Sequence, residues 1–165
     1  TRGSDVALPM LLQDVLYLVD PKLAQKGIRL ETDLAIPSAD LCRVPRDLSQ
    51  VLLNLIQNAI DVSPAGRVIR LEVGVEQGVA RIKVIDQGPG IEPDVLPHIF
   101  EPFYSRKKTD TEPGMGLGLS VCHSLLQAMG GHIDVMTAVG QGTTFTVHVP
   151  FSTQDRQTTD QGGSL

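Results

Sequence analysis

Apolar residues recur every three or four positions in several parts of the chain, the spacing that gives a helix one apolar face. The first of these parts ends at Gly27, and glycine is favoured just past a helix C-terminus. The first predicted helix covers residues 8–26, and the second opens at Pro45 or Asp47 and stops near Ser63-Pro64. A short helix is predicted near 93–99, and the last runs from about Leu117 to Met129 and ends at Gly130-Gly131.

Elsewhere apolar and polar residues alternate, which predicts strands with one buried face. Gln77-Gly78 separates two alternating runs and is a good hairpin signal. The predicted strands are residues 28–34, 67–76, 79–86, 132–138 and 143–151, the last two joined by the turn 139–142. This order of helices and mostly antiparallel strands predicts an α+β sandwich in which helices cover one face of one sheet.

Residues 87–116 interrupt this regular pattern with a segment rich in Gly and Pro. A compact domain rarely keeps so long a stretch with little regular structure unless the stretch is a lid or a binding loop. We therefore expect a ligand between this segment and the helix that precedes Ser63.

Composition narrows the class of protein. The 165 residues carry a net charge of -5, which argues against a nucleic-acid-binding surface, and no apolar run is long enough to span a membrane. Cys42 and Cys122 have no metal-ligand spacing, so we expect buried thiols in a reducing compartment, hence a cytoplasmic domain without membrane contact. Any membrane anchor of the parent protein would lie outside this chain, and no secretory leader is visible.

The helix "LSQVLLNLIQNAIDVS" carries a polar row beside its apolar face. Asn54, Asn58 and Asp61 fall at positions i, i+4 and i+7. Amide and carboxylate oxygens suit Mg²⁺, which keeps waters and phosphate oxygens as its other ligands. The same amides could equally cap neighbouring backbone groups or face solvent.

Two glycine-rich segments carry further candidate chemistry. In "DQGPGI" (86–91), Asp86 ends an apolar strand and could accept a hydrogen bond from an adenine amine, although a plain turn also fits. In "GMGLGLS" (114–120), glycines precede a helix N-terminus, a junction that suits phosphate but also fits a flexible hinge.

Taken together, these segments resemble the N, G1, F and G2 boxes of the GHKL ATPase/kinase superfamily. Residues 5–151 are most similar to the catalytic ATP-binding domain of two-component sensor histidine kinases, of the nitrogen-regulator and dicarboxylate-sensor branch. "IFEPFYSRK" (99–107) looks like the F box. The resemblance implies a Bergerat-type two-layer sandwich, a mixed five-stranded sheet backed by three helices, with ATP under a lid at about Tyr104–Met115.

The resemblance also implies a role for each matching residue. Asn58 would ligate Mg²⁺, Asn54 would lie near the phosphates and Lys107 would reach the terminal phosphate; these three are the expected catalytic residues. Phe100 and Phe103 would anchor the lid. The remaining nucleotide-binding residues would be Asp86 with Thr143 at the adenine amine, Gly88, Gly90 and Ile91 around the base, and Gly114, Gly116, Leu117, Gly118 and Leu119 along the phosphates.

The chain departs from the family pattern at two places. Asp61 and Val62 stand where many histidine kinases have Lys and Tyr, so Asp61 would act beside the metal ion. Ser105 stands where other branches have Arg, and Arg106 or Lys107 could supply that charge. Gyrase-type relatives carry a general-base Glu at the position of Asn54, and a neutral amide cannot accept that proton.

The implied function is transfer of the γ-phosphoryl group of ATP to a histidine on a separate dimerisation and phosphoacceptor hairpin. None of the four histidines is followed by Asp or Glu, as the acceptor histidine of this family is. The expected partners are that hairpin of the same parent protein and a downstream response regulator, with the isolated domain a monomer. The alternatives are a nucleotide-sensing module without transfer, and an anti-sigma-type serine kinase.

The two ends of the chain are expected to lie outside this domain. Gly3-Ser4 is typical of an expression scar, so the first residues carry no fold prediction. Residues 152–165 are polar and lack periodicity, which predicts a mobile tail.

Overall fold

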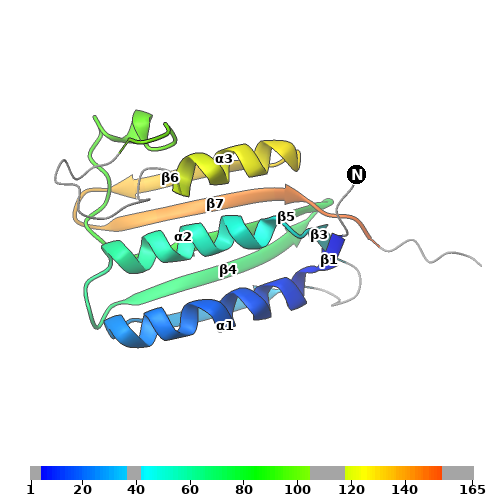
Figure 1. Ribbon diagram of the computed structural model, residues 1–165, viewed down its shortest axis with the longest axis horizontal. Helices are drawn as coiled ribbons and strands as arrows, with labels where there is room; N and C mark the ends of the chain where they lie inside the picture. The colour runs from blue at the N-terminus through cyan, green and yellow to red at the C-terminus, as the bar shows by residue number, and fades with distance from the viewer. Residues whose placement is uncertain (1–4, 37–41, 105–117, 154–165) are drawn as a thin grey trace, which may run out of the picture.

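The computed structural model describes residues 5–36, 42–104 and 118–153. Three helices lie side by side over one face of a sheet (Figure 1). They are α1 (Leu8–Lys26), α2 (Leu48–Val62) and α3 (Gly118–Ala128), and a 3-10 turn, η1 (Leu96–His98), lies between α2 and α3 in the sequence. Gly27 has a left-handed φ of 70° and caps α1, as predicted. None of the helices in these ranges is long and apolar enough to cross a membrane.

The sheet has five strands in the order β2-β4-β5-β7-β6. Strands β2 and β4 pair in parallel and the other neighbours pair antiparallel, so the sheet is mixed. The strands are β2 (Arg29–Ala35), β4 (Val68–Glu76), β5 (Val79–Ile85), β6 (His132–Ala138) and β7 (Gly142–Pro150). The predicted α+β class, with a mixed five-stranded sheet backed by three helices, is confirmed.

Helix α2 is the centre of the core. Its apolar face is buried from Leu48 to Ile60, and the inward side chains of β4, β5 and β7 pack beneath it. Asp47 precedes the first turn but makes no side-chain capping hydrogen bond. At the other end the Lys26 amine donates to the carbonyl oxygens of Ile60 and Asp61, at 2.6 and 2.7 Å. A cation there neutralises the negative end of the helix dipole.

A short second sheet was missed by the sequence analysis. Strand β1 (Asp5–Ala7) pairs antiparallel with β3 (Arg43–Pro45), and Arg43 also forms a bridge with Ser152. Two backbone hydrogen bonds of 2.9 Å hold that bridge. Three-residue strands are too short to show alternation, so only the folded chain reveals them.

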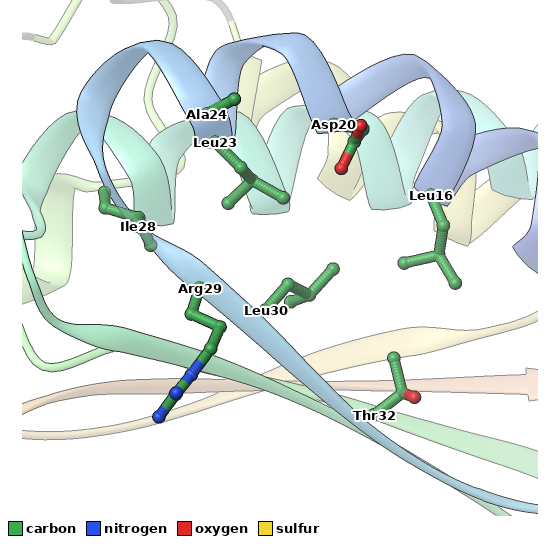
Figure 2. A pocket seen from close by; sticks show the side chains of 8 residues that line it. All are labelled: Leu16, Asp20, Leu23, Ala24, Ile28, Arg29, Leu30 and Thr32. Atoms are coloured by element: carbon green, nitrogen blue, oxygen red, sulfur yellow. The ribbon is translucent and has the colours of Figure 1, made fainter.

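A hollow of about 430 Å³ lies between α1 and the edge strand β2 (Figure 2). Leu23 and Leu30 face each other across it, while Arg29 points away from the helix. Its lining includes Asp20 and Thr32 but none of the residues expected to bind nucleotide.

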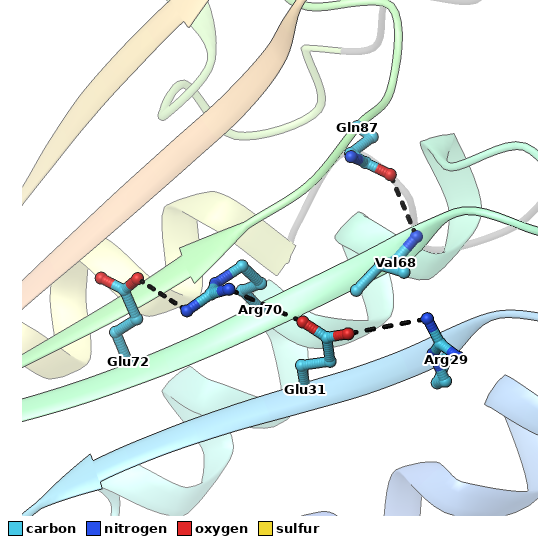
Figure 3. Close-up of polar contacts among 6 residues, drawn as sticks. All are labelled: Arg29, Glu31, Val68, Arg70, Glu72 and Gln87. Carbon is cyan, nitrogen blue, oxygen red and sulfur yellow. Dashed lines mark hydrogen bonds and ion pairs between the residues drawn. The ribbon is translucent and has the colours of Figure 1, made fainter.

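The opposite face of the sheet carries charged side chains, and none of the described helices lies on it (Figure 1). Glu31 lies 3.6 Å from both Arg29 and Arg70, and Arg70 lies 3.5 Å from Glu72 (Figure 3). Exposed ion pairs of this kind add little stability. They keep this face polar, so that the sheet has one covered face and one solvated face.

Candidate functional site

The amide row of α2 is divided between two tasks. Asn54 is half-buried; its Nδ2 donates to the carbonyl oxygen of Gly118 at 3.2 Å, and its Oδ1 accepts from Gln50 at 2.8 Å. Asn58 is also half-buried, yet its side chain makes no hydrogen bond with any residue in the described ranges. A polar group in that position is available to a ligand. Of the two amides, that of Asn54 therefore ties α2 to the start of α3, and that of Asn58 is available to a ligand.

Cys122 lies fully buried beneath this joint, 3.6 Å from the carbonyl oxygen of Val51. Burial raises the pKa of the Cys122 thiol to about 11, although the Asn54 side chain opposes the shift. Burial also raises the pKa of Cys42. Both cysteines are free and buried, as predicted. A protonated buried thiol is a poor nucleophile, so Cys122 is a packing residue.

Asp86 is held at the end of β5 with one carboxylate oxygen committed. Oδ1 accepts from the backbone N–H groups of Gly88 at 2.9 Å and Thr143 at 3.1 Å. Oδ2 receives no hydrogen bond from the part of the chain that the structure describes. The residue is only 5% exposed, and burial raises the pKa of its carboxyl, while the two N–H donors lower it. A fixed carboxylate with one open oxygen is suited to accept from an exocyclic amine.

Two of the predicted glycines are needed because the loop passes close to other backbone. A Cβ on Gly88 would lie 2.9 Å from the carbonyl oxygen of Val62, at the end of α2. Gly90 has a φ of 77°, and a Cβ there would overlap the carbonyl of Ala138. The loop after Asp86 thus touches α2 on one side and β6 on the other.

Thr137 is a supporting residue that sequence reasoning missed. Its Oγ1 accepts from the N–H of Ile91 at 2.9 Å and lies 3.1 Å from the carbonyl oxygen of Gly142 and 2.9 Å from Thr143 Oγ1. If Thr137 donates to the Gly142 carbonyl, its contact with Thr143 uses the proton of Thr143. One hydroxyl therefore joins the loop after Asp86 to both strands of the last hairpin.

Gly142 is the second residue missed. Its φ is 102°, and a Cβ there would overlap the carbonyl of Asp86. The signal available in the sequence was the pair of glycines in the turn 139–142. Their spacing predicted a turn, but it could not show that the turn packs against Asp86.

The remaining predicted site residues fall into two groups. Ile91, Phe100 and Leu119 are half-buried against the core, and the Phe100 ring lies 5.5 Å from the His123 ring; Phe103 is 79% exposed. Asp61 is exposed at the end of α2. The other group, Lys107, Gly114, Gly116 and Leu117, lies outside the described residues, as do Ser105, Arg106 and all of the expected lid (Tyr104–Met115) except Tyr104.

Contacts between neighbouring segments bring the described candidates together. Asn54 meets Gly118, Val62 meets Gly88, and Asp86 meets Thr143. The helix bearing the amides, the loop after β5, the last hairpin and the start of α3 therefore converge. Asp86, Asn58 and the start of α3 supply an amine acceptor, a free carboxamide and the positive end of a helix dipole.

This combination of fold and converging polar groups is that of a nucleotide-binding ATPase domain. Residues 43–153 match the family described as histidine kinase-, DNA gyrase B-, and HSP90-like ATPase, and the chain belongs to that family. Within it the chain has the sequence and fold of the sensor histidine kinase ATP-binding domain, as its similarity to named relatives shows.

Sensor histidine kinase AruS of Pseudomonas aeruginosa is 38% identical over 148 residues, which cover 86% of this chain and 15% of AruS. Full-length ShkA in complex with AMPPNP superposes with a TM-score of 0.79 at 32% identity, over 93% of this chain and 32% of that one. The catalytic domain of histidine kinase ThkA gives 0.77 at 27% identity, over 91% of this chain and 96% of that one. ThkA in complex with the response regulator TrrA gives 0.72 at 26% identity, over 89% and 41%.

The chain spans between 12% and 40% of the length of the first curated relatives it matches. It therefore corresponds to one domain of those proteins, and what their other domains contribute is not contained in it.

Proposed function

We propose that this chain binds Mg-ATP and transfers the γ-phosphoryl group to a histidine on a separate phosphoacceptor domain in two-component signalling. The observation that supports this best is that two converging segments carry Asp86, which has one open carboxylate oxygen, and Asn58, whose half-buried amide makes no hydrogen bond with the described residues. These groups match the two ends of a purine nucleotide.

At the base end, Oδ2 of Asp86 accepts the adenine amine, because Oδ1 is already used by two backbone donors. Thr143 assists from β7. Gly88 and Gly90 keep the loop close to the base, since a side chain at either position would meet neighbouring backbone.

At the phosphate end, Asn58 is the residue that would hold Mg²⁺, and its free carboxamide fits an oxygen-ligated hard cation. Bound Mg²⁺ would neutralise charge on the phosphate oxygens. Asn54 holds the start of α3 against α2, so the N–H groups of the first turn of α3 can face the phosphates. Lys107 and the glycines from Gly114 to Gly116 retain the roles predicted from the resemblance.

Kinase chemistry fits this site better than hydrolysis. Water attack needs a general base beside the nucleophile, and Asn54 stands where gyrase-type relatives carry Glu. A carboxamide accepts no proton at neutral pH. Phosphoryl transfer, in contrast, depends mainly on positioning and charge neutralisation.

The phosphoacceptor and the signalling partner lie outside this chain in our proposal. None of the four histidines has the following acidic residue, and the relatives are much longer. A dimeric helical hairpin of the parent protein would carry the acceptor, and a response regulator, as in the ThkA–TrrA complex, would receive the phosphoryl group.

Labelled ATP tests the proposal. The chain is incubated with [γ-³²P]ATP and Mg²⁺, with and without the purified hairpin domain of its parent protein. We expect acid-labile label on the hairpin and almost none on this chain. Asp86→Asn should label the hairpin much less at ATP concentrations below the wild-type Kd, and Glu92→Gln, on an exposed loop carboxylate, should label it as the wild type does. Strong label on this chain alone would contradict the proposal, acid-stable label would indicate a serine kinase, and tight ATP binding without transfer would indicate a sensing module.

A further inference from the structure

A cluster of three potential metal-ligating side chains lies on the solvated face of the sheet, and none of the three is among the expected nucleotide-binding residues. His132 and Asp134 come from β6 and His148 comes from β7. One ligand atom of each lies within 4.8 Å of the other two. Among the described residues, this is the one grouping of three His, Cys, Asp or Glu with that geometry.

Strand pairing accounts for the cluster. His132 lies directly opposite His148 in the antiparallel register of β6 and β7. Asp134 is two residues along β6, and side chains two apart on a strand share one face. The neighbours Ile133 and Val147 point to the other face, against the helices. The sheet therefore holds all three ligands on its open side.

The two imidazoles already converge on a single oxygen. Oδ2 of Asp134 lies 3.0 Å from Nε2 of His148 and 3.7 Å from Nε2 of His132. The rings are stacked, with centroids 4.3 Å apart and planes 10° from parallel. Because the two Nε2 atoms and the carboxylate face one another, a cation among them would replace contacts that the three groups now make with each other.

We propose that His132, Asp134 and His148 form a binding site for a borderline transition-metal cation of the Zn²⁺ class. Two imidazoles and a carboxylate are a common ligand set for such ions, with water at the remaining position. Mg²⁺ prefers oxygen ligands and is disfavoured here. Binding requires the rings to turn out of their parallel stack, and the 66% exposure of the His132 side chain gives it room to do so.

The surroundings set an upper limit on the affinity. Arg81 of β5 lies directly opposite His148 on the other side of β7, and Lys83 lies opposite Thr146, which itself faces Asp134. These cations repel a divalent ion. A site with three ligands, open to solvent and flanked by Arg81, is expected to bind in the micromolar range, and Arg81→Gln should tighten it.

Metal binding here would tie the edge strand to the sheet. Strand β6 pairs only with β7 in the five-stranded sheet, and five residues beyond His132 it carries Thr137, which supports the nucleotide loop. An ion bridging β6 and β7 would therefore stabilise the hairpin on which that loop rests. This effect does not depend on the proposed kinase function.

Zinc chloride added to the tag-free chain tests the site. We expect one equivalent to bind by calorimetry. At about a hundred times the Kd, the folded-to-unfolded ratio should rise about a hundredfold. For a domain of this size the Tm should then rise by about 5–10 °C. His132→Gln, Asp134→Asn and His148→Gln should each weaken binding ~10-fold or more, because each removes one of three ligands.

His98→Gln is the matched control. His98 also lies 2.9 Å from a carboxylate, that of Glu101, but this pair is not part of a group of three potential metal ligands among the described residues. Its zinc affinity should be unchanged. NMR of the imidazoles should show His132 and His148 shifting together on titration. A Kd for zinc weaker than about 1 mM, roughly a thousandfold weaker than the micromolar affinity expected here, would overturn the proposal. So would equal affinity in His132→Gln, or displacement of the zinc by excess Mg²⁺.

Discussion

Replacing Asp86 with Asn changes one atom of the candidate adenine site and leaves the rest of the local structure in place. Oδ1 of an Asn at this position can still accept from the N–H groups of Gly88 and Thr143, now at 2.9 and 3.1 Å. The other carboxylate oxygen becomes an NH₂ group. That group is a donor, and it would face the adenine amine, which is also a donor.

The expected loss follows from the chemistry of this single contact. A hydrogen bond to a charged group contributes about 1.5–3 kcal/mol. Losing it should raise the Kd for ATP roughly 10- to 150-fold. Two apposed donors can reorient or admit water, so the loss should not greatly exceed this range. The Mg²⁺ dependence of binding should stay as in the wild type, since Asn58 is untouched.

The same substitution has the opposite effect on the stability of the free domain. Burial raises the folded-state pKa of Asp86 above its ordinary value of 3.8, so between these two values the folded chain holds more protons than the unfolded chain. Stability therefore falls as pH rises through that window, and the cost persists at neutral pH. Asp86→Asn removes this cost, so its Tm at pH 7 should equal or exceed that of the wild type. The difference should shrink as the pH approaches 3.8.

Calorimetric titration with ATP and thermal melts at several pH values measure both effects on one protein sample. Glu92→Gln is the control, because it makes the same carboxylate-to-amide change at an exposed position nearby. An Asp86→Asn protein that binds ATP as tightly as the wild type would refute the adenine assignment. A Tm at pH 7 well below that of the wild type would instead refute the claim that Oδ1 alone holds the loop.

Three further substitutions test other parts of the site. Asn58→Ala should weaken ATP binding in Mg²⁺ far more than in EDTA, and an equal loss in both conditions would remove Asn58 from the metal site. Thr137→Val should lower the free energy of unfolding in urea by about 1–3 kcal/mol, because its hydroxyl contacts two other segments, whereas Thr137→Ser should restore most of it. Gly90→Ala should destabilise the fold by more than ~2 kcal/mol, since the new Cβ would overlap the Ala138 carbonyl. Gly140→Ala, also at positive φ but in open space, should cost about 1 kcal/mol. Equal losses would contradict the claim that close packing at position 90 requires glycine.

The fold was predictable from the sequence because its elements are long and strongly patterned. The apolar face of α2 continues over more than two helical turns, and the alternation of apolar and polar residues in β4 and β5 continues over several residue pairs. At the turn Gln77-Gly78, the φ values of 50° and 77° match the tight hairpin turn that a glycine at this position predicts. The short strands β1 and β3 carry no such pattern, and their pairing depends on segments nearly forty residues apart.

The chemistry-bearing residues were predictable in kind but not in geometry. Asp86 stood out because an acid at the end of an apolar strand needs a partner. Thr137 did not stand out, since a threonine in a strand is ordinary. Its importance comes from the register of β6 with β7, which sets it opposite Thr143. The contact of the Lys26 amine with the end of α2 was also not predictable, because it joins two helices whose packing the sequence pattern does not show.

The position of Asn54 joins the structural and the chemical arguments. Its amide donates to the Gly118 carbonyl and accepts from Gln50, so the joint between α2 and α3 needs a side chain that does both. A carboxylate at this position could not donate to Gly118, and it would repel that carbonyl oxygen. The residue that fixes the first turn of α3 is therefore also one that cannot act as a general base on water. If the proposed function is right, one carboxamide would both hold the phosphate end of the site together and leave ATP unhydrolysed.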